Sequence, residues 1–245
     1  MESPTSATVV DDSRVLRSEF LPYLPLMAFL AELLGPRTEV VLHDTSDLSR
    51  SIVALTNGHV SGRSVGGPAT DLVLKVLQNH EHDDQDFLAN YLAVSRAGGS
   101  FRSSTFFIRD ADDGVVGMLC INIDDGPLTR ARDLLTAITA TTGLVKGEPR
   151  TEEPRPSRAA EPVAERLSAT VDELAHDGID RIIAARGVEP QRMTSEEKIA
   201  TVRELERAGV FLLKGAVAQV ASALHVSEPT VYRYHQAVRR GPRSV

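Results

Sequence analysis

Apolar residues recur at helical spacing near the start of the chain, and the period changes further on. Six of them lie three or four residues apart and predict a helix over about residues 14–34, which Gly35 and Pro36 end. They are Leu16, Phe20, Leu24, Met27, Leu30 and Leu34. Five later segments are short, rich in β-branched or aromatic residues and bounded by Gly, Asn or Asp, which predicts strands. These segments are TEVVLHD, SIVALTN, NYLAVSR, SFRSSTFFIRD and GVVGMLCINID.

Two further helices are predicted in this part of the chain. One begins at about Thr70, between the second and third strands, and the other covers about residues 129–144 after the last strand. Two strands, a helical connection and a three-strand meander make up the plan of a PAS-type sensory domain, whose sheet and helices enclose a small-molecule pocket. We therefore predict an α+β fold, with a PAS-like antiparallel sheet domain and flanking helices over residues 14–145. Residues 1–13 are predicted to be disordered.

A change of composition marks the end of this domain. Residues 146–162 hold four prolines, many charges and almost no apolar side chain, so we predict a linker. A connecting helix is predicted over residues 163–190, because Leu167, Val171 and Leu174 fall on one face. A helix with a single apolar stripe needs a partner. We expect it to pack on the C-terminal domain or on its copy in a dimer.

The chain ends in a helix-turn-helix pattern, within an all-α DNA-binding domain predicted over residues 191–245. The pattern reads KGAVAQVASALHVSEPTVYRYHQAVRR, and its apolar residues fall where two short crossing helices bury them. Ser227 can cap the second helix through its side-chain oxygen, and Pro229 falls in that helix's first turn. His225 stands at the turn, where glycine is usual, and histidine tolerates a positive φ better than most residues. In this motif the second helix enters the major groove of DNA.

DNA contacts are predicted from residues on the exposed faces of these two helices and at their starts. They are Lys214, Gln219, Ser227, Glu228, Thr230, Tyr232, Arg233 and Gln236. From residue 191 onward nine basic and five acidic residues give a net charge of +4, whereas the rest of the chain carries −11. A basic end on an acidic body is typical of a protein that contacts phosphates at one end only. Because one motif reads few base pairs, we expect an inverted-repeat operator in double-stranded DNA, bound by a homodimer or a higher even oligomer.

Polar residues also lie where the strand pattern predicts a protected interior or a sheet end. As candidates for ligand binding we take His43, Asp44, Asn57, Arg63, Asn90, Ser103, Ser104 and Asn122. Buried polar groups are costly unless they are paired, so they either pair with one another or converge on a ligand. We favour a small-molecule effector, a carboxylate or an amino-acid-like molecule, with Arg63 as the partner of its carboxylate and Asp44 as the partner of an ammonium group.

Several motifs together resemble those of the YheO-like regulators. They are EVVLHD, SIVALTNGHVSGRSVGGPATDL, NYL, RSSTFFIRD, GMLCINID and KIATVRELERAGVFLLKGAVAQVASALHVSEPTVYRYH, and they cover residues 20–235 apart from the linker. That family joins a YheO-type PAS domain to a C-terminal helix-turn-helix and includes the D-arginine-utilisation repressor. The resemblance implies a DNA-binding transcriptional regulator, more often a repressor, that senses a small molecule. The chain departs from the family in its long proline-rich linker and in Glu228, which stands at a position expected to face DNA.

Other classes of function are less well supported by the sequence. Cys120, paired with His43 or His59, could serve as a nucleophile, but a single cysteine in an apolar strand is usually packed in the core, and no nucleotide-binding glycine motif is present, so we predict no enzyme. The acidic and histidine-containing segment 80–86 could hold a cation, or a histidine could ligate haem, yet no zinc-type spacing occurs and we predict no metal and no cofactor. A further alternative makes the PAS-like domain a dimerisation or protein-interaction platform only.

Composition gives the expected location. Hydrophobic residues make up 42% and charged residues 25% of the 245, as is typical of soluble globular proteins, and the most apolar stretch is too short to span a bilayer. A single cysteine suits a reducing compartment. We therefore predict a cytoplasmic protein without a membrane partner.

Overall fold

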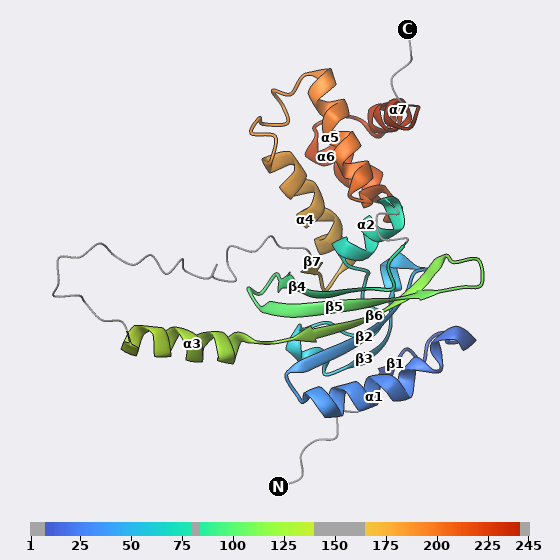
Figure 1. Cartoon of the computed structure of the whole chain (residues 1–245). Coiled ribbons are helices and arrows are strands. Elements are labelled where there is room, and N and C mark those ends of the chain that lie inside the picture. Colours follow the sequence, from blue (N-terminus) through green and yellow to red (C-terminus); the bar gives the residue numbers. More distant parts are fainter. Residues whose placement is uncertain (1–7, 80–83, 140–164, 241–245) are drawn as a thin grey trace, which may run out of the picture.

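A seven-stranded sheet organises the N-terminal two thirds of the chain. The computed structural model describes residues 8–79, 84–139 and 165–240, and the strand order of its sheet is β1-β3-β2-β6-β5-β4-β7 (Figure 1). The strands are β1 (Val9–Val10), β2 (Thr38–Asp44), β3 (Ile52–Thr56), β4 (Phe87–Ser95), β5 (Ser100–Arg109), β6 (Val115–Ile123) and β7 (Glu165–Leu167). The helices of this part are η1 (Ser18–Phe20), α1 (Tyr23–Leu34), η2 (Leu48–Arg50), η3 (Gly58–Val60), α2 (Asp71–Asn79) and α3 (Gly126–Thr139).

All five predicted strands form, and two short strands extend the sheet at its edges. β7 pairs parallel with β4, whereas the other pairs are antiparallel, so the sheet is mixed rather than purely antiparallel as predicted. β1 pairs with β3 through Val9 and Val10, so the prediction of disorder over residues 1–13 was wrong for this segment. The two valines are β-branched and favour an extended backbone, and the edge of β3 offers backbone groups with which this segment can form hydrogen bonds. Residues 1–7 lie outside the described part of the chain.

The two faces of the sheet pack against different helices. Because successive strand residues point to opposite faces, Val40 and Leu42 lie on one side of β2 and Val41 on the other. The first face packs on α1 and η1, where Met27 and Phe20 are completely buried. The second face packs on α2 and carries most of the buried polar side chains described below.

Five helical segments form the C-terminal domain. They are α4 (Val171–Ala184), α5 (Ser195–Arg207), η5 (Val210–Leu212), α6 (Ala216–Ala223) and α7 (Glu228–Arg239). The helix predicted from residue 163 begins instead at Val171, because residues 165–167 belong to β7 and the Thr170 side chain caps α4 by accepting from the amide of Glu173. Thr194 and Glu197 form a capping box at the start of α5. The predicted linker, residues 146–162, lies outside the described part of the chain.

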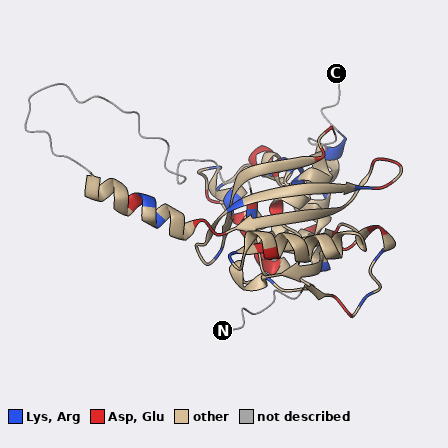
Figure 2. Cartoon of the chain, turned by 60° about the horizontal axis from the view of Figure 1, so that its bottom comes forward, with Lys and Arg blue, Asp and Glu red and all other residues tan. Residues whose placement is uncertain are grey.

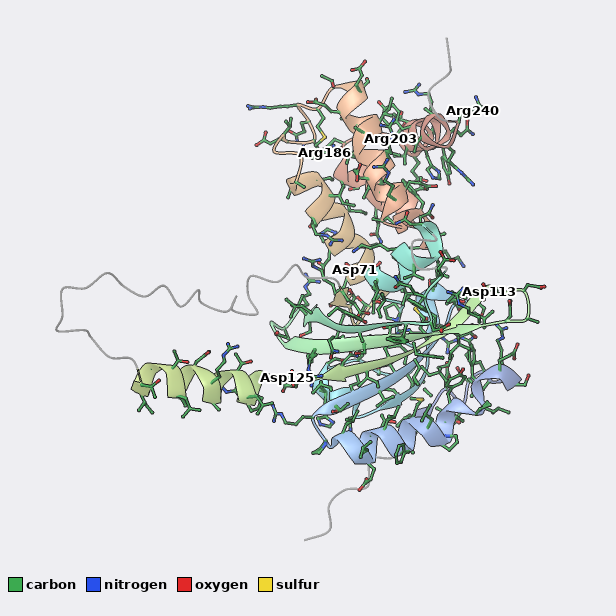
Figure 3. The ribbon with its side chains drawn as sticks, in the orientation of Figure 1. Asp71, Asp113, Asp125, Arg186, Arg203 and Arg240 are labelled. Atoms are coloured by element: carbon green, nitrogen blue, oxygen red, sulfur yellow. The ribbon has the colours of Figure 1, made fainter. Side chains whose placement is uncertain are left out.

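The C-terminal helical domain docks on the N-terminal sheet domain through α2. One buried cluster runs without interruption from Val73 and Leu74 of α2 to Val210 and Leu205 in the C-terminal helices. At the start of α2, Asp71 (labelled in Figure 3) accepts a 2.6 Å hydrogen bond from the backbone amide of Arg166 and lies 3.4 Å from the Arg181 guanidinium of α4. The two domains are therefore joined by apolar packing and by one buried carboxylate.

Gly209 allows a close approach to α2 at this junction, and its replacement tests the docking. Its φ is +73°, and a Cβ there would lie 2.6 Å from the carbonyl oxygen of Leu74. Gly215 has a similar φ of +83°, but a Cβ at this position would meet nothing within 4 Å, so it is a matched control. We expect Gly215→Ala to cost about 1–2 kcal/mol through backbone strain alone. Gly209→Ala should cost about 1–3 kcal/mol more, because α2 must also move. Chemical denaturation of the two variants measures the difference, and equal losses would contradict this docking.

Candidate functional site: a DNA-reading helix and a buried polar cluster

The predicted helix-turn-helix is formed by α6 and α7. The Ser227 side chain accepts from the backbone amide of Thr230 and caps α7, and Pro229 occupies the first turn. His225 takes the left-handed conformation at the turn, with a φ of 51°. Val231 and Tyr234 of α7 are buried against α6 and α5. These local features confirm the sequence prediction of two helices joined by a tight turn.

The outer face of α7 presents polar and basic side chains. Glu228, Tyr232, Arg233 and Gln236 are exposed, and the Arg233 guanidinium lies 5.6 Å from the centre of the Tyr234 ring. Thr230 is half-buried. A helix that buries one face and exposes such residues on the other has the arrangement of a recognition helix. Contact of each side chain with a base stays a prediction.

The other three predicted DNA contacts differ in their surroundings. Lys214 is exposed just before α6. The Ser227 oxygen is already used in the cap of α7. Gln219 points toward α4, since its Nε2 donates to Asp172 at 3.2 Å. The structure therefore separates Gln219 from the exposed face of α7.

α7 is held in place by contacts with α5 and η5. His235 forms a close side-chain contact with Glu206 of α5 and stacks on Phe211, with 4.3 Å between the ring centres. Further apolar contacts come from Val202 and Leu224, which are completely buried. This packing fixes the direction in which the exposed face of α7 points.

The second candidate site is a row of buried polar side chains across three strands of the sensory domain. Glu39, Asn122 and Ser103 face one another on β2, β6 and β5 by strand register. Glu39 accepts from Arg63 at 2.6 Å, from the side-chain amide of Asn122 at 2.8 Å and from Ser61 at 2.5 Å. Ser103 donates to the side-chain oxygen Oδ1 of Asn122 at 2.7 Å. These interactions connect three predicted ligand residues, Arg63, Ser103 and Asn122, through a carboxylate.

A second group of polar side chains continues the cluster toward the edge of the sheet. The Tyr91 hydroxyl lies 2.7 Å from the Thr105 hydroxyl and donates to the Glu165 carboxylate of β7 at 2.9 Å. Burial raises the pKa of Glu165, and it raises the pKa of the Tyr91 hydroxyl as well. The Cys120 thiol lies 3.2 Å from Thr105. We call the two groups together, with His43, the polar cluster.

Two atoms of the polar cluster are buried without a hydrogen-bond partner among the described residues. They are Nη1 of Arg63 and Nε2 of His43. The Ser51 hydroxyl donates to the carbonyl oxygen of Asp44, so it accepts from Nδ1 of His43, 3.1 Å away. His43 Nε2 is then the unprotonated nitrogen and can accept a hydrogen bond, while Arg63 Nη1 can donate one.

The charge of His43 follows from its position. Burial lowers the pKa of His43 to about 3, and the nearby Arg63 guanidinium acts in the same direction. Arg63 itself stays charged: burial lowers the pKa of its guanidinium, but the adjacent Glu39 carboxylate more than compensates and raises it. The polar cluster therefore holds a neutral histidine beside a paired arginine.

The remaining four ligand candidates lie outside the polar cluster. Asp44 points to the opposite face of β2 and pairs with Arg14 at 2.6 Å. Asn57, with a φ of 57°, donates to the carbonyl oxygen of Thr38. Asn90 is exposed, and its backbone amide donates to Ser104 at 3.1 Å. The sequence prediction did not distinguish the two faces of each strand. Asp44 and Ser104 each follow a residue of the polar cluster, His43 and Ser103, by one position and therefore point to the opposite face.

Two members of the polar cluster were missed by the sequence analysis. Glu39 could have been recognised, because it directly precedes the apolar run Val40–Leu42 and points to the same face of the strand as His43. Glu165 gave no local signal, since the residues around it were predicted to be linker and helix. It reaches the polar cluster only because β7 pairs with β4.

The structure also places the residues that were considered for catalysis and for metal binding. Cys120 is buried, and burial raises the pKa of its thiol to about 12, which disfavours the nucleophilic thiolate. Within the described ranges no group of three potential metal ligands occurs, and most of the acidic, histidine-containing segment, residues 80–83, lies outside them. None of the helices that the structure describes is long and apolar enough to cross a membrane.

The neutral state of His43 predicts how stability depends on pH. Its pKa is about 3 in the folded protein and 6.5 in the unfolded chain, so the unfolded state binds more protons between these values. The free energy of unfolding should therefore fall as pH drops below about 6.5, by up to about 1.4 kcal/mol per pH unit. His43→Asn should flatten this slope in urea denaturation between about pH 7 and pH 4.5. The raised pKa of Glu165 acts in the opposite direction, but it is present in both proteins and cancels in the difference. His59→Asn, at an exposed histidine, is the control, and an unchanged slope in His43→Asn would contradict a buried neutral imidazole.

Comparison with known proteins assigns both parts of the chain. The YheO-like PAS domain family matches residues 15–140, and an HTH domain family matches residues 174–235. The chain is 30% identical over 213 residues to the uncharacterized protein YheO of Escherichia coli, a match that covers 86% of this chain and 81% of that protein.

Two further relatives extend over most of the chain. An uncharacterized protein of Haemophilus influenzae is 28% identical over 233 residues, 94% of each chain. The transcriptional regulator DauR of Pseudomonas aeruginosa is 24% identical over 212 residues, 86% of this chain and 90% of that protein. A PAS-like sheet domain, a helix-turn-helix with an exposed polar face and these matches lead to one conclusion. The chain belongs to the YheO-like family and is a DNA-binding transcriptional regulator with a PAS domain and a helix-turn-helix domain.

Proposed function

We propose that the polar cluster binds a small polar metabolite and that its occupancy changes the affinity of the helix-turn-helix for DNA. The observation that carries this proposal is the pair of unsatisfied buried atoms, Arg63 Nη1 and His43 Nε2. A buried polar group without a partner costs free energy, and proteins tolerate this mainly where a ligand or a functional constraint compensates for it.

The two atoms define the class of ligand. Arg63 Nη1 offers a donor and a positive charge, which suits a carboxylate oxygen. His43 Nε2 offers an acceptor, which suits an N–H or O–H group of the same molecule. An amino acid or a hydroxylated carboxylate carries both groups close together. The proposed effector is therefore a small molecule of this kind.

The connection to DNA binding runs through β7. Glu165 reaches into the polar cluster, and the next residue, Arg166, donates through its backbone amide to Asp71. α4 of the DNA-binding domain begins at Val171, and its Arg181 also pairs with Asp71. A ligand that changes the contacts of Glu165 would displace β7 and with it the docking of α4. It can shift DNA affinity only by the difference between its affinities for the two arrangements, typically about 1–3 kcal/mol.

The remaining aspects of the function follow from the family and the DNA-binding helix. A protein that reads an inverted repeat with one helix-turn-helix per chain binds as a dimer or a higher even oligomer. We propose repression as the direction of control, on the resemblance to a family that includes a repressor. A cytoplasmic location accompanies DNA binding, and the buried, protonated Cys120 supports a role without catalysis.

Ligand binding is tested by thermal shift of the full chain with D- and L-amino acids and small carboxylates. A ligand at a hundredfold excess over its dissociation constant should stabilise the wild type by about 2.7 kcal/mol. Arg63→Lys keeps a positive charge opposite Glu39 but lacks the free Nη1, so it should fold and lose the response. Asn90→Ala, at an exposed candidate outside the polar cluster, should keep it. If no compound in the panel shifts the wild type, the polar cluster is structural and the sensory domain is a dimerisation platform.

DNA recognition is tested at the outer face of α7. Arg233→Ala should weaken binding to a duplex selected by the wild type by about 1–3 kcal/mol and relax its sequence preference, as expected for a groove-facing arginine. Lys214→Ala should weaken binding to selected and random duplexes alike and reduce the salt dependence, as expected for a phosphate contact. Titrations by fluorescence anisotropy at several salt concentrations measure both effects. Equal losses on the two duplexes for Arg233→Ala would show that this arginine contacts only phosphate.

A further inference from the structure

The helix α3 projects from the sheet without covering any part of it. It leaves the end of β6 and extends away from the body of the molecule in both views (Figures 1 and 2). None of its residues is buried, and Leu128, Leu134, Leu135 and Ile138 are each 64–80% exposed. An isolated helix of 14 residues is marginal in water, so its apolar side chains need a partner.

The apolar residues of α3 follow a heptad. Leu128, Ala131, Leu135 and Ile138 are spaced by three, four and three residues, which places them at successive a and d positions. The charged residues Arg130, Arg132 and Asp133 all lie off this line, in the middle of the helix (Figure 2). We call these four a and d residues the α3 seam. A heptad of this kind packs against another helix with the same spacing, and a second copy of this chain supplies one.

The helix α4, the other candidate for assembly, is already occupied. Its apolar residues Leu174, Ala175 and Ile179 are 1–3% exposed and belong to the core of their own chain. The expectation that this helix pairs with its copy in a dimer therefore has no free apolar face to support it. The following segment of the same chain is also a poor cover for α3, since residues 140–164 hold four prolines and only Leu144, Val145 and Val163 as large apolar side chains.

The start of α3 is anchored to the sheet, so its direction is defined. Asp125 pairs with Arg102 of β5 at 2.9 Å, and the Asp124 side chain accepts from the amide of Gly126 at 2.8 Å (Asp125 is labelled in Figure 3). Asp124 also pairs with Arg37, next to the end of α1. A helix anchored at one end and free along its length can present the seam to a second molecule without rearrangement of the sheet.

We propose that the α3 seam is the dimerisation surface of this regulator and packs against the α3 seam of a second copy. The contact between the two α3 helices does not depend on the proposed function. Only its consequence for DNA binding rests on the proposed reading of an inverted repeat. Two heptads bury less surface than the roughly 1,200 Å² of stable interfaces, so the free dimer is expected to dissociate in the micromolar range. On adjacent half-sites the pairing becomes effectively intramolecular, and a weak contact then suffices for cooperative binding.

The experiment compares two glutamate substitutions in the full chain by sedimentation velocity over a concentration series. Leu135→Glu places a charge in the seam, whereas Ala137→Glu places the same charge on the opposite face of α3 and is the matched control. Leu135→Glu should weaken dimerisation at least tenfold, and Ala137→Glu should match the wild type. Circular dichroism checks that both variants are folded. A Leu135→Glu dimer as strong as the wild type, or a wild type that is monomeric both free and on its operator, would overturn the proposal.

Binding to DNA and to effector separates this proposal from the proposed function. On a duplex with one half-site Leu135→Glu should bind like the wild type, and on a duplex with two half-sites it should lose cooperativity. Its thermal shift with an effector should be unchanged, because the polar cluster lies in a single chain. Loss of half-site binding would contradict the assignment of α3 to assembly alone. Flotation with anionic phospholipid vesicles that depends on Leu135, with no change in oligomeric state, would assign the seam to a membrane surface and overturn the proposal.

Discussion

Asp71 joins three parts of the molecule that lie far apart in the sequence. It begins α2 of the sensory domain, accepts from the backbone of β7 and faces Arg181 of the DNA-binding domain. A carboxylate that is 6% exposed is stabilised there by the hydrogen bond from the backbone amide of Arg166 and by the positive charges of the Arg166 and Arg181 side chains. The arrangement of the two domains depends on this site, since the apolar packing around α2 has no direction of its own.

The polar cluster is organised by a buried ion pair within a network of hydrogen bonds. Glu39 has three donors and is fully satisfied, so the pair that it forms with Arg63 organises the strands around it. A buried ion pair contributes little net stability compared with apolar packing of the same volume. The pair fixes the position of the Arg63 guanidinium through Nη2, while Nη1 has no hydrogen-bond partner among the described residues. The unpaired atoms are therefore a consequence of a network that is otherwise complete.

The two sides of the PAS-like domain differ in how much apolar side-chain surface they expose. α1 covers one face of the sheet through Met27 and Ala31 but leaves Phe29 and Leu33 60% and 65% exposed on its outer side. α3 covers no face at all. Large contiguous apolar patches often mark surfaces that meet other molecules, whereas single exposed apolar residues are normal. By contrast, the second face of the sheet is closed by α2 and the DNA-binding domain of the same chain, so the exposed apolar side chains of α1 and α3 lie away from the domain junction.

Local sequence determined most of the elements and the whole of the helix-turn-helix motif. The spacing of Val231 and Tyr234, the cap at Ser227 and the turn at His225 are short-range features, and each was found in the structure as predicted. The five strands from residue 38 to residue 123 were predicted for the same reason, because alternation and turn residues act within a few positions. The order of these strands and helices along the chain indicated the α+β class as well.

Long-range strand pairing determined the features of the structure that local sequence could not predict. β7 joins β4 across the linker and carries Glu165 into the polar cluster, and nothing in the residues around Glu165 indicates a strand. Whether a polar side chain faces inward depends on its parity in the strand, so only the sheet register separated Ser103 from Ser104 and His43 from Asp44. Local signals act over one turn or one hairpin, whereas strand pairing and domain docking depend on contacts between residues that the chain brings together only when it folds.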